Sequence, residues 1–420
     1  MTAAPLDPGS LPIEERLAAA GLPPLPRLAW LELDLDALVA NLSTLRGAAG
    51  GVAAYPVVKG NAYGHGAWPI ARALLAAGAA GVCVATLDEA AALREAGIEG
   101  PIRVLYPVPP ALVAAAAAHR LTLVAGDRDG LAATLHAYAD LRARGTTIPP
   151  IELEIEVETG LGRGGVAPDE VVALARAIEA APGVRLVGLW THLQASEDEE
   201  RTGAQLERFE RATTALRDAG VTVPPRHVAA SGGVLTGVPG FDAIRPGLST
   251  YGIWPDELAG HASAGVASVV LRPVMSIHAR PVRVADLLAG HGIAYGPSFT
   301  TARASRIATL PLGYGDGFAR ANANRAEALV RGQRVPLVGN VMMDGVSADV
   351  TDVPGEPVTT ADEFVLMGSQ GGERITVEDL AQLRTTNTWE VVTQMSARMP
   401  RVYHAAAGAV ALSTLVERRG

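Results

Sequence analysis

A lysine at the end of an apolar run is the first residue in this sequence that points to chemistry. Lys59 closes the run AAYPVVK, and the turn-forming residues GNAYGHG follow it. Burying an ammonium group is costly unless the group is paired or used chemically. Because desolvation lowers the pKa of an amine and frees its lone pair, a Schiff-base lysine is one interpretation. A lysine that simply emerges into solvent at a strand end is the other.

Further polar residues follow apolar runs and could build a site around this lysine. Tyr63 lies in a glycine-rich turn and offers a hydroxyl group to a phosphate. Ser231 and Arg245 end two later runs, where an ordinary loop serine and a structural salt bridge are the alternatives. Arg163, in GLGRGG, could reach an anionic group, whereas His192 at the end of LVGLWTH could also be a core histidine.

Eight short apolar runs, separated in several places by alanine-rich helical patterns, must position these residues. The runs are AAYPVVK, VCVATL, IRVLYPV, LTLVA, IELEIEV, LVGLWTHL, HVAAS and FDAIRPG. Strands that alternate with helices pair in parallel, and eight such units predict a closed (β/α)8 TIM barrel over residues 28–265. An open doubly wound sheet is the alternative, but no G-x-G-x-x-G opens a helix after the first strand. In a barrel, active groups lie at the carboxyl ends of the strands, where these candidates fall.

The pattern of apolar and polar residues changes after the barrel region. Residues 266–420 contain alternating runs such as VMSIHARPVRV, RIATLPLGY and RVPLVGNVM, punctuated by glycine and proline, which predict a second, β-rich domain. Thr376, with Asp379 three residues later, predicts a capped helix. Residues 1–27 are expected to be an N-terminal extension.

Composition excludes several functional classes. The formal charge of -9 disfavours a nucleic-acid partner, and the 49% hydrophobic content supports a sizeable core. The single cysteine, Cys83, cannot form a disulfide within the chain, and no Cys/His cluster predicts a metal site. The start of the chain lacks a secretory signal pattern and no run is long enough to span a membrane, so we expect a cytoplasmic enzyme without a membrane partner.

Taken together, these segments resemble the alanine racemase family of fold-type III pyridoxal-phosphate (PLP) enzymes. VVKGNAYGHG is close to the PLP-lysine signature of that family. The resemblance continues in the family order from about residue 28 to 405, through VETGLGRGG, GLWTHL, RPGLSTYG, IAYGPSFTT, LPLGYGDGFAR and VPLVGNVMMDGVSADV. It implies a homodimer with shared active sites that interconverts L- and D-alanine and feeds D-alanine to cell-wall peptidoglycan precursors.

The resemblance also implies a role for each matching residue. Lys59 would carry PLP and act as the base on one face of the substrate, and Tyr295 of the partner subunit would act on the other. Arg245 would face the pyridine nitrogen, and His192 would support Arg245 and Tyr295. The phosphate would be held by Tyr63, Ser231, Gly247 and Leu248. Arg163 would approach both the phenolic oxygen of the cofactor and the substrate carboxylate. Further substrate contacts would come from the backbone amide of Met343, Tyr314 at the entrance and Trp389 beside the pocket.

The chemistry of racemisation is consistent with those roles. The α-proton leaves from one face and a proton returns to the other, so two bases flanking a planar carbanion are expected. A free tyrosine has a pKa of about 10, so Tyr295 needs a cationic neighbourhood, for which His192 and Arg245 are the candidates. Arg245 does not readily give up its proton, so the cofactor ring should stay unprotonated and transamination should be disfavoured.

Four positions depart from the pattern of the family. Glu156 stands where a carbamylated lysine often orients the arginine, and we hypothesise that its carboxylate replaces the carbamate. Trp389 replaces a tyrosine that touches the phosphate and bounds the pocket, and Ala397 and Asn340 replace residues of the access path. These departures leave open a racemase for another or a broader set of amino acids. A fold-type III decarboxylase usually carries a catalytic cysteine in its second domain, which this sequence lacks, and a non-enzymatic PLP-binding barrel would lack that domain.

Overall fold

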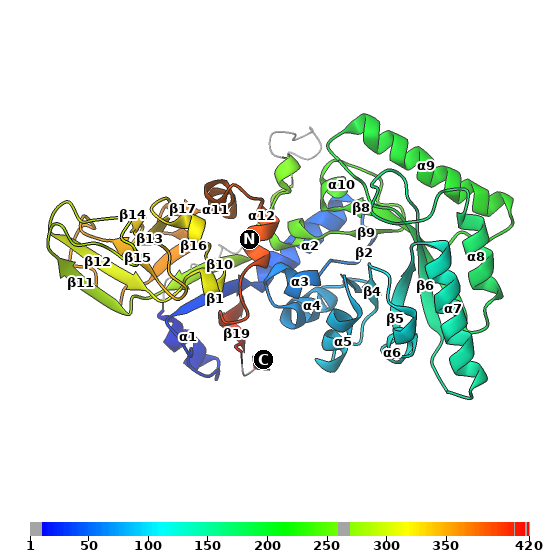
Figure 1. The fold of residues 1–420 in the computed structure, drawn as a ribbon, viewed down its shortest axis with the longest axis horizontal. Coiled ribbons are helices and arrows are strands. Elements are labelled where there is room, and N and C mark those ends of the chain that lie inside the picture. The colour runs from blue at the N-terminus through cyan, green and yellow to red at the C-terminus, as the bar shows by residue number, and fades with distance from the viewer. Residues whose placement is uncertain (1–10, 259–268, 407, 416–417, 420) are drawn as a thin grey trace. The chain divides into compact units, whose positions relative to one another are not determined.

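The computed structural model describes residues 11–258, 269–406, 408–415 and 418–419 (Figure 1). Contacts divide the chain into two compact units, one made of residues 1–38, 63–69 and 273–420 and the other of residues 39–62 and 70–272. The sequence analysis expects the barrel domain to begin at residue 28. In the structure, the strand at residues 29–34 lies in the unit that contains residues 273–420. The expected boundary at residues 265 and 266 lies outside the described residues.

The unit of residues 39–62 and 70–272 is built on a ring of parallel strands. Its sheet has eight strands in the order β2-β9-β8-β7-β6-β5-β4-β3. A parallel bridge between Val57 and Cys83 joins the two ends of this order, so the sheet closes into a barrel. All eight predicted strands are therefore present, and the predicted TIM barrel is confirmed. The strands are β2 (Ala53–Ala54), β3 (Val82–Val84), β4 (Ile102–Val104), β5 (Leu121–Ala125), β6 (Ile151–Glu156), β7 (Val184–Trp190), β8 (Arg226–Ala230) and β9 (Ala243–Arg245).

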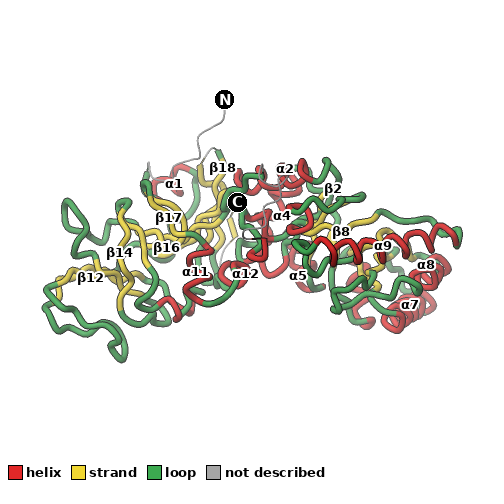
Figure 2. The backbone as a smooth tube through the Cα atoms, turned by 90° about the horizontal axis from the view of Figure 1, so that it is seen from above, coloured by secondary structure: helices red, strands yellow, loops and turns green. Residues whose placement is uncertain are grey.

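Helices surround this barrel and bury one stripe of apolar side chains against it. In α8, for example, Val171, Leu174, Ala175 and Ile178 recur at helical spacing and are buried. Helices α7, α8 and α9 lie side by side outside the strands (Figure 2). The helices of this region are α2 (Leu35–Ala48), α3 (Lys59–Tyr63), α4 (Ala67–Ala76), α5 (Leu87–Glu95), α6 (Val113–Ala118), α7 (Arg128–Ala143), α8 (Val171–Ala180), α9 (Glu199–Asp218) and α10 (Ser231–Leu235).

The other unit is a β-rich structure, as the sequence predicts for its C-terminal part. Its strands follow the order β11-β12-β15-β14-β13-β16-β10-β1-β18-β19-β20, and β17 pairs with β16. They are β1 (Ala29–Asp34), β10 (Met275–Ala279), β11 (Arg283–Leu287), β12 (Ser305–Leu310), β13 (Glu327–Val330), β14 (Gln333–Val338), β15 (Val346–Asp349), β16 (Phe364–Gln370), β17 (Glu373–Ile375), β18 (Arg401–Ala405), β19 (Gly408–Ser413) and β20 (Arg418–Arg419). Strand β1 lies between β10 and β18, and all of its residues except the last are buried.

Helices α1, α11 and α12 lie in the β-rich unit. The predicted capped helix is α11 (Val377–Arg384), in which Thr376 accepts a hydrogen bond from the Asp379 amide and the Asp379 side chain returns one. Helix α12 (Thr388–Thr393) follows it. Within the expected N-terminal extension, α1 (Ile13–Ala19) buries Ile13 and Leu17 in a cluster with residues of β1, β18 and β19. The extension is therefore part of the packed structure of this unit at α1.

A buried polar cluster ties α1 to the same sheet. Arg16 donates to both carboxylate oxygens of Glu32, at 2.9 Å and 2.5 Å. His278 Nδ1 lies 2.8 Å from Glu363 Oε1, and the ligand atoms of Glu32, His278 and Glu363 lie within 4.8 Å of one another. Because a guanidinium already neutralises Glu32, we interpret these residues as an ion-pair cluster that anchors α1. No helix among the described parts of the chain has the length and apolar character to cross a membrane.

Candidate active site

Lys59 begins an unusual turn at the end of the first barrel strand. Gly60, Asn61, Ala62 and Tyr63 all have positive φ angles near 50–61°, which makes the turn left-handed. Such a conformation costs free energy in residues other than glycine and needs support from its surroundings. One support is Glu89, whose Oε1 accepts a hydrogen bond from the Gly60 amide at 2.6 Å. The backbone that presents the lysine is thus held by a side chain from α5.

The environment of Lys59 favours the neutral amine. Partial burial is the largest cause that lowers its pKa, and the positive charge of Arg163 lowers it further. Glu89 opposes this effect without reversing it. A larger neutral fraction of the amine is what a nucleophilic or Schiff-base lysine requires. The interpretation of Lys59 as a solvent-facing lysine is therefore the weaker of the two.

Arg245, at the end of β9, is fixed by several hydrogen bonds inside the barrel. It is 2% exposed. Its Nη1 lies 2.5 Å from His227 Nδ1 and donates to the His227 carbonyl at 2.8 Å, and its Nη2 donates to the Thr191 carbonyl at 2.8 Å. The guanidinium also lies 4.8 Å from the ring centroid of Trp190. Burial lowers the pKa of Arg245 to about 10, so it stays protonated at neutral pH.

His192 lies next to Arg245 but does not add positive charge. Its Nδ1 lies 3.5 Å from Arg245 Nη2. Burial, followed by the charges of Arg245 and Arg163, lowers the pKa of His192 to about 3. The ring is therefore neutral at neutral pH, because a second cation beside a buried guanidinium is unfavourable. The neutral ring adds no positive charge beside Arg245, and the support of Tyr295 by these two residues stays a prediction.

The loops after the last two barrel strands meet at Ser231. The Oγ of Ser231 accepts hydrogen bonds from the amides of Gly247, at 2.9 Å, and Ser249, at 3.2 Å. Leu248 follows Gly247 and begins a 3-10 turn, whose Tyr251 donates its hydroxyl to the Val57 carbonyl at 2.8 Å. The structure thus brings Ser231, Gly247 and Leu248 together, near the strand that leads to Lys59. Tyr63 belongs by its contacts to the β-rich unit.

Arg163, in the loop after β6, forms an ion pair with Glu156, the buried last residue of β6. Arg163 Nη2 lies 3.5 Å from Glu156 Oε1, and its guanidinium lies 5.6 Å from the ring centroid of Tyr106. Burial raises the pKa of Glu156, although the Arg163 charge acts in the opposite direction. Glu156 therefore contacts the arginine it was expected to orient. Tyr106, just after β4, is a neighbour that the sequence did not single out.

The remaining predicted residues lie in the β-rich unit and are largely exposed. Tyr295 is 79% exposed, Met343 51% and Tyr314 45%, while Trp389 in α12 is half-buried. Tyr314 and Met343 are neighbours, because the amides of Tyr314 and the following glycine donate to the carbonyls of Met342 and Met343. Asn340 lies beside Tyr295, as its amide bonds the Tyr295 carbonyl at 2.8 Å. Ala397 is exposed.

The sequence analysis did not identify the buried polar side chains of the barrel interior, which lead to Arg245. The main ones are Arg103, Glu154 and His227, which are all buried inside the barrel. A signal was present, since the strand IELEIEV carries three glutamates at alternate positions, and one face of a barrel strand points inward. The side chains of Thr159, Thr191 and Gln205 form a second polar group, in which Gln205 Nε2 donates to Thr159 Oγ1 at 3.0 Å and to the His192 carbonyl at 3.2 Å.

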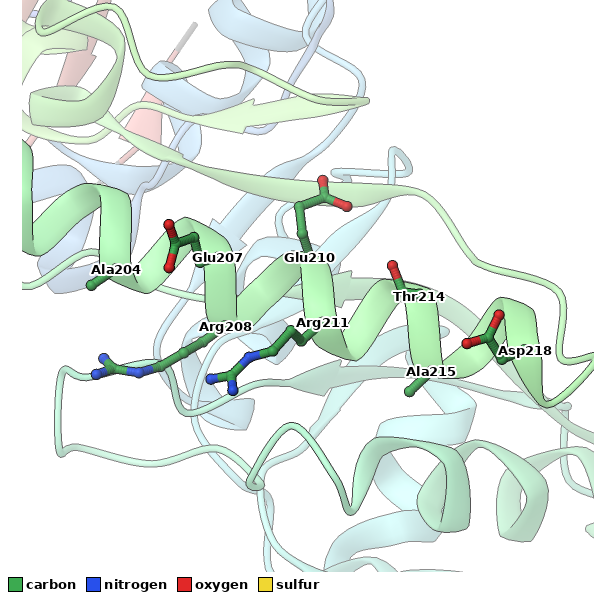
Figure 3. A pocket seen from close by; sticks show the side chains of 8 residues that line it. All are labelled: Ala204, Glu207, Arg208, Glu210, Arg211, Thr214, Ala215 and Asp218. Atoms are coloured by element: carbon green, nitrogen blue, oxygen red, sulfur yellow. The ribbon is translucent and has the colours of Figure 1, made fainter.

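A hollow of about 720 Å³ runs along the outer face of α9 (Figure 3). Its lining is one helix face of mixed charge, consisting of Ala204, Glu207, Arg208, Glu210, Arg211, Thr214, Ala215 and Asp218. None of the residues predicted for the site lines this hollow. It is a surface feature of the barrel's helical layer, distinct from the polar strand ends described above.

The barrel, with a lysine and a buried arginine at the carboxyl ends of its strands, and the added β-rich unit define a two-domain barrel enzyme. The family model for the alanine racemase N-terminal domain matches residues 33–255, and the model for the C-terminal domain matches residues 274–403. The chain therefore belongs to the alanine racemase family.

Known proteins are similar to this chain over most of its length. An alanine racemase of Symbiobacterium thermophilum is 39% identical over 381 residues, which is 90% of this chain and 97% of that protein. The crystal structure of alanine racemase from Bacillus anthracis with bound L-Ala-P is similar with a TM-score of 0.83 and 31% identity, covering 94% of this chain and 99% of that one. A histidine racemase of Leuconostoc mesenteroides subsp. sake has a TM-score of 0.81 and 27% identity, covering 91% and 99%.

Proposed function

We propose that this protein is a PLP-dependent racemase that interconverts L- and D-alanine. The observation that carries the proposal is the pairing of a lysine of lowered pKa with a buried, immobilised arginine at the mouth of one barrel. Membership of the alanine racemase family supports alanine as the substrate.

The residues present fit a bound PLP. The Lys59 amine is poised to attach the cofactor, and Arg245 would meet the ring nitrogen. The phosphate would lie against Ser231 and the backbone of Gly247 and Leu248, with Tyr63 as a further donor. One observation on this loop favours a ligand: the buried Ser249 hydroxyl has no hydrogen-bond partner among the described residues. A buried hydroxyl without a partner is costly, and a phosphate oxygen would satisfy it.

Two residues would transfer protons, and others would bind the substrate. PLP, when bound, serves as the electron sink that makes the α-carbon of the substrate acidic. Lys59 would hold or accept the proton at its Nζ on one face, and Tyr295 of the partner subunit would do so at its Oη on the other. Arg163, oriented by Glu156, would bind the substrate carboxylate together with the Met343 amide. The 79% exposure of Tyr295 is consistent with a role at an interface between subunits.

Solvent deuterium exchange tests the proposed reaction. The wild-type protein is incubated with PLP in D2O and with a panel of L-amino acids that includes alanine, serine, histidine and lysine. We expect exchange at the α-carbon and racemisation to be fastest with alanine, and neither to occur with Lys59→Ala. Absence of α-exchange with every amino acid would refute the racemase proposal.

A mixing experiment tests the shared site. Lys59→Ala and Tyr295→Phe homodimers should each be inactive, and subunit exchange would create a hybrid with one intact site. We expect about a quarter of the wild-type activity from a random mixture. A mixture that stays as inactive as its components would contradict the homodimer with shared active sites. We also propose a cytoplasmic location, which localisation of a tagged protein in its host would test.

A broader substrate range is the second candidate. Trp389 and Asn340 depart from the family pattern at the predicted pocket and its access path, and a histidine racemase is among the similar structures. The amino-acid panel decides between the two: α-exchange with histidine or lysine at a rate comparable to that with alanine would favour the broader racemase.

A further inference from the structure

Four polar side chains form a continuous chain across the interior of the barrel. Arg103 of β4 donates from Nε to Glu154 Oε1 of β6 at 2.6 Å. The same oxygen lies 3.3 Å from His227 Nε2 of β8, and His227 Nδ1 lies 2.5 Å from Arg245 Nη1 of β9. All four residues are at most 9% exposed. The chain ends at the arginine that the proposed function assigns to the cofactor ring.

The geometry determines where the proton of His227 must be. A guanidinium nitrogen can only donate, so Nδ1 must offer its lone pair to Arg245. The proton of the neutral ring is then on Nε2, which faces the Glu154 carboxylate at 3.3 Å. Burial lowers the pKa of His227 to about 4, which agrees with a neutral ring. A negative oxygen beside Nε2 stabilises this tautomer over the alternative, whose Nδ1 proton would point at a cation.

The surroundings leave room for this arrangement and hold it in place. A Cβ on Gly188 would lie 2.4 Å from Glu154 Oε1, so the absence of a side chain at that position admits the carboxylate. The Trp190 ring stacks on His227 with an interplanar angle of 11°, and the Arg103 guanidinium lies 3.3 Å from the ring centroid of Tyr55. Glu154 is therefore buried, paired and packed, with its pKa lowered to about 2, because its partners outweigh the cost of burial.

We propose that Glu154 is a positioning residue of the active site, which fixes the Nε2–H tautomer of His227 and thereby the orientation of the Arg245 guanidinium. The inference rests on the proposed function only for the role of Arg245 at the cofactor. A buried carboxylate that orients a histidine, which in turn orients a reacting group, follows the same logic as the outer partners of catalytic histidines and metal ligands. Arg103 balances the charge of Glu154, so the carboxylate can remain ionised inside the barrel.

The test compares Glu154→Gln with Glu152→Gln. Glu152 lies two residues earlier on the same strand, but it pairs with Arg185 and Thr122 and is 36% exposed, so it serves as the matched control. Nitrogen-15 NMR of histidine-labelled protein reports the tautomer of His227, whose signal is identified by its loss in His227→Gln. We expect the Nε2–H tautomer alone in the wild type and in Glu152→Gln. A glutamine amide at position 154 can donate to Nε2, and the negative oxygen beside Nε2 is then gone. Glu154→Gln should therefore show the Nδ1–H tautomer or a mixture, with the Arg245 guanidinium turned away from Nδ1.

Kinetics supply the second readout. Glu154→Gln should lower kcat by about tenfold or more, in line with losses of outer positioning partners, while Glu152→Gln should leave it unchanged. If Glu154→Gln fails to fold, the double variant Glu154→Gln/Arg103→Met removes the unpaired cation and is measured in the same way. A folded variant at position 154 that keeps the Nε2–H tautomer and a wild-type kcat would overturn the proposal. Because the NMR readout does not depend on turnover, a failed racemase assay would be a separate result.

Discussion

Asn340 holds the backbone at Tyr295 by two hydrogen bonds from one amide group. Its Nδ2 donates to the carbonyl of Tyr295 at 2.8 Å and to that of Gly296 at 3.2 Å. The segment needs such support, because Ala294 has a φ of 62°, which costs free energy in a residue other than glycine. Asn340, which the sequence marks only as a departure on the access path, is thus also a clamp on the tyrosine expected to be the second base.

We therefore predict that Asn340→Ala slows racemisation by roughly threefold to tenfold, the range expected for losing one or two modest hydrogen bonds. Asn340→Asp, which keeps the shape but cannot donate, should behave similarly. The loss should appear as a larger primary deuterium isotope effect in the direction in which Tyr295 removes the proton. Hydrogen exchange of the segment around Tyr295 should also become faster. Equal isotope effects in both directions would argue against the clamp.

The second prediction concerns the cofactor anchor. Lys59→Ala should abolish the visible absorbance of the protein–PLP adduct after gel filtration, because no amine remains at the end of the first barrel strand to attach the cofactor. The melting temperature of the apoprotein should stay close to that of the wild type, since Lys59 is only partly buried and its ammonium form is disfavoured there. A variant that retains a stoichiometric visible absorbance would show that the anchor lies elsewhere.

The third prediction follows from the charge of Arg245. In Arg245→Glu, a protonated carboxyl group could give its proton to the ring nitrogen, which would favour charge build-up in the ring. We expect pyruvate, the product of transamination, to accumulate from alanine at a higher ratio to racemisation than in the wild type. Product analysis by mass spectrometry measures that ratio, with Lys59→Ala as the inactive control. No rise in pyruvate would count against the role of Arg245.

The fourth prediction tests Glu156 as a built-in carboxylate. The wild-type activity should be the same in carbon-dioxide-free buffer and in bicarbonate. The partner of Arg163 is the Glu156 carboxylate, which is negatively charged without forming a carbamate. Glu156→Gln should raise KM for alanine by about tenfold, as expected when a charge-assisted contact is lost. Glu156→Lys should regain activity only when bicarbonate is added. Bicarbonate-dependent activity of the wild type would contradict the hypothesis.

The fifth prediction concerns acid stability. The pKa of His227 is lowered to about 4 by burial, below the ordinary value of 6.5, so the unfolded chain binds its proton first. The free energy of unfolding is therefore unaffected by His227 above pH 6.5. It decreases as the pH falls toward 4, by roughly 3 kcal/mol for a shift of this size. Glu154, with a pKa lowered to about 2 from 4.5, adds a loss at still lower pH. Urea unfolding from pH 7 to 4 should show this decline, and His227→Gln should make it shallower between pH 6.5 and 4, where His192, with a pKa lowered to about 3, contributes the rest.

Much of the barrel could be predicted because its signals are local. Each strand is a short apolar run bounded by turn residues, and each helix buries a stripe at helical spacing, so the order of elements was visible in the sequence. Lys59, Ser231 and Arg245 could be proposed because they end such runs, and the parallel barrel places strand ends on one rim. The capping pair Thr376 and Asp379 is equally local.

Tertiary structure decided what depends on residues far apart in sequence. Strand β1 comes early in the chain but lies between β10 and β18, since only long-range pairing can select its neighbours. The four polar side chains that connect Arg103 to Arg245 come from four different strands. The alternating glutamates of β6 indicate an inward-facing side of that strand, but no spacing in the sequence predicts which polar groups meet inside the barrel. The neutral state of His192 arises from burial beside two cations, which depends on distances that only the folded barrel sets. The sequence determined which chemical groups are available, and the closed sheet determined which of them meet, because burial and Coulomb interactions act through space rather than along the chain.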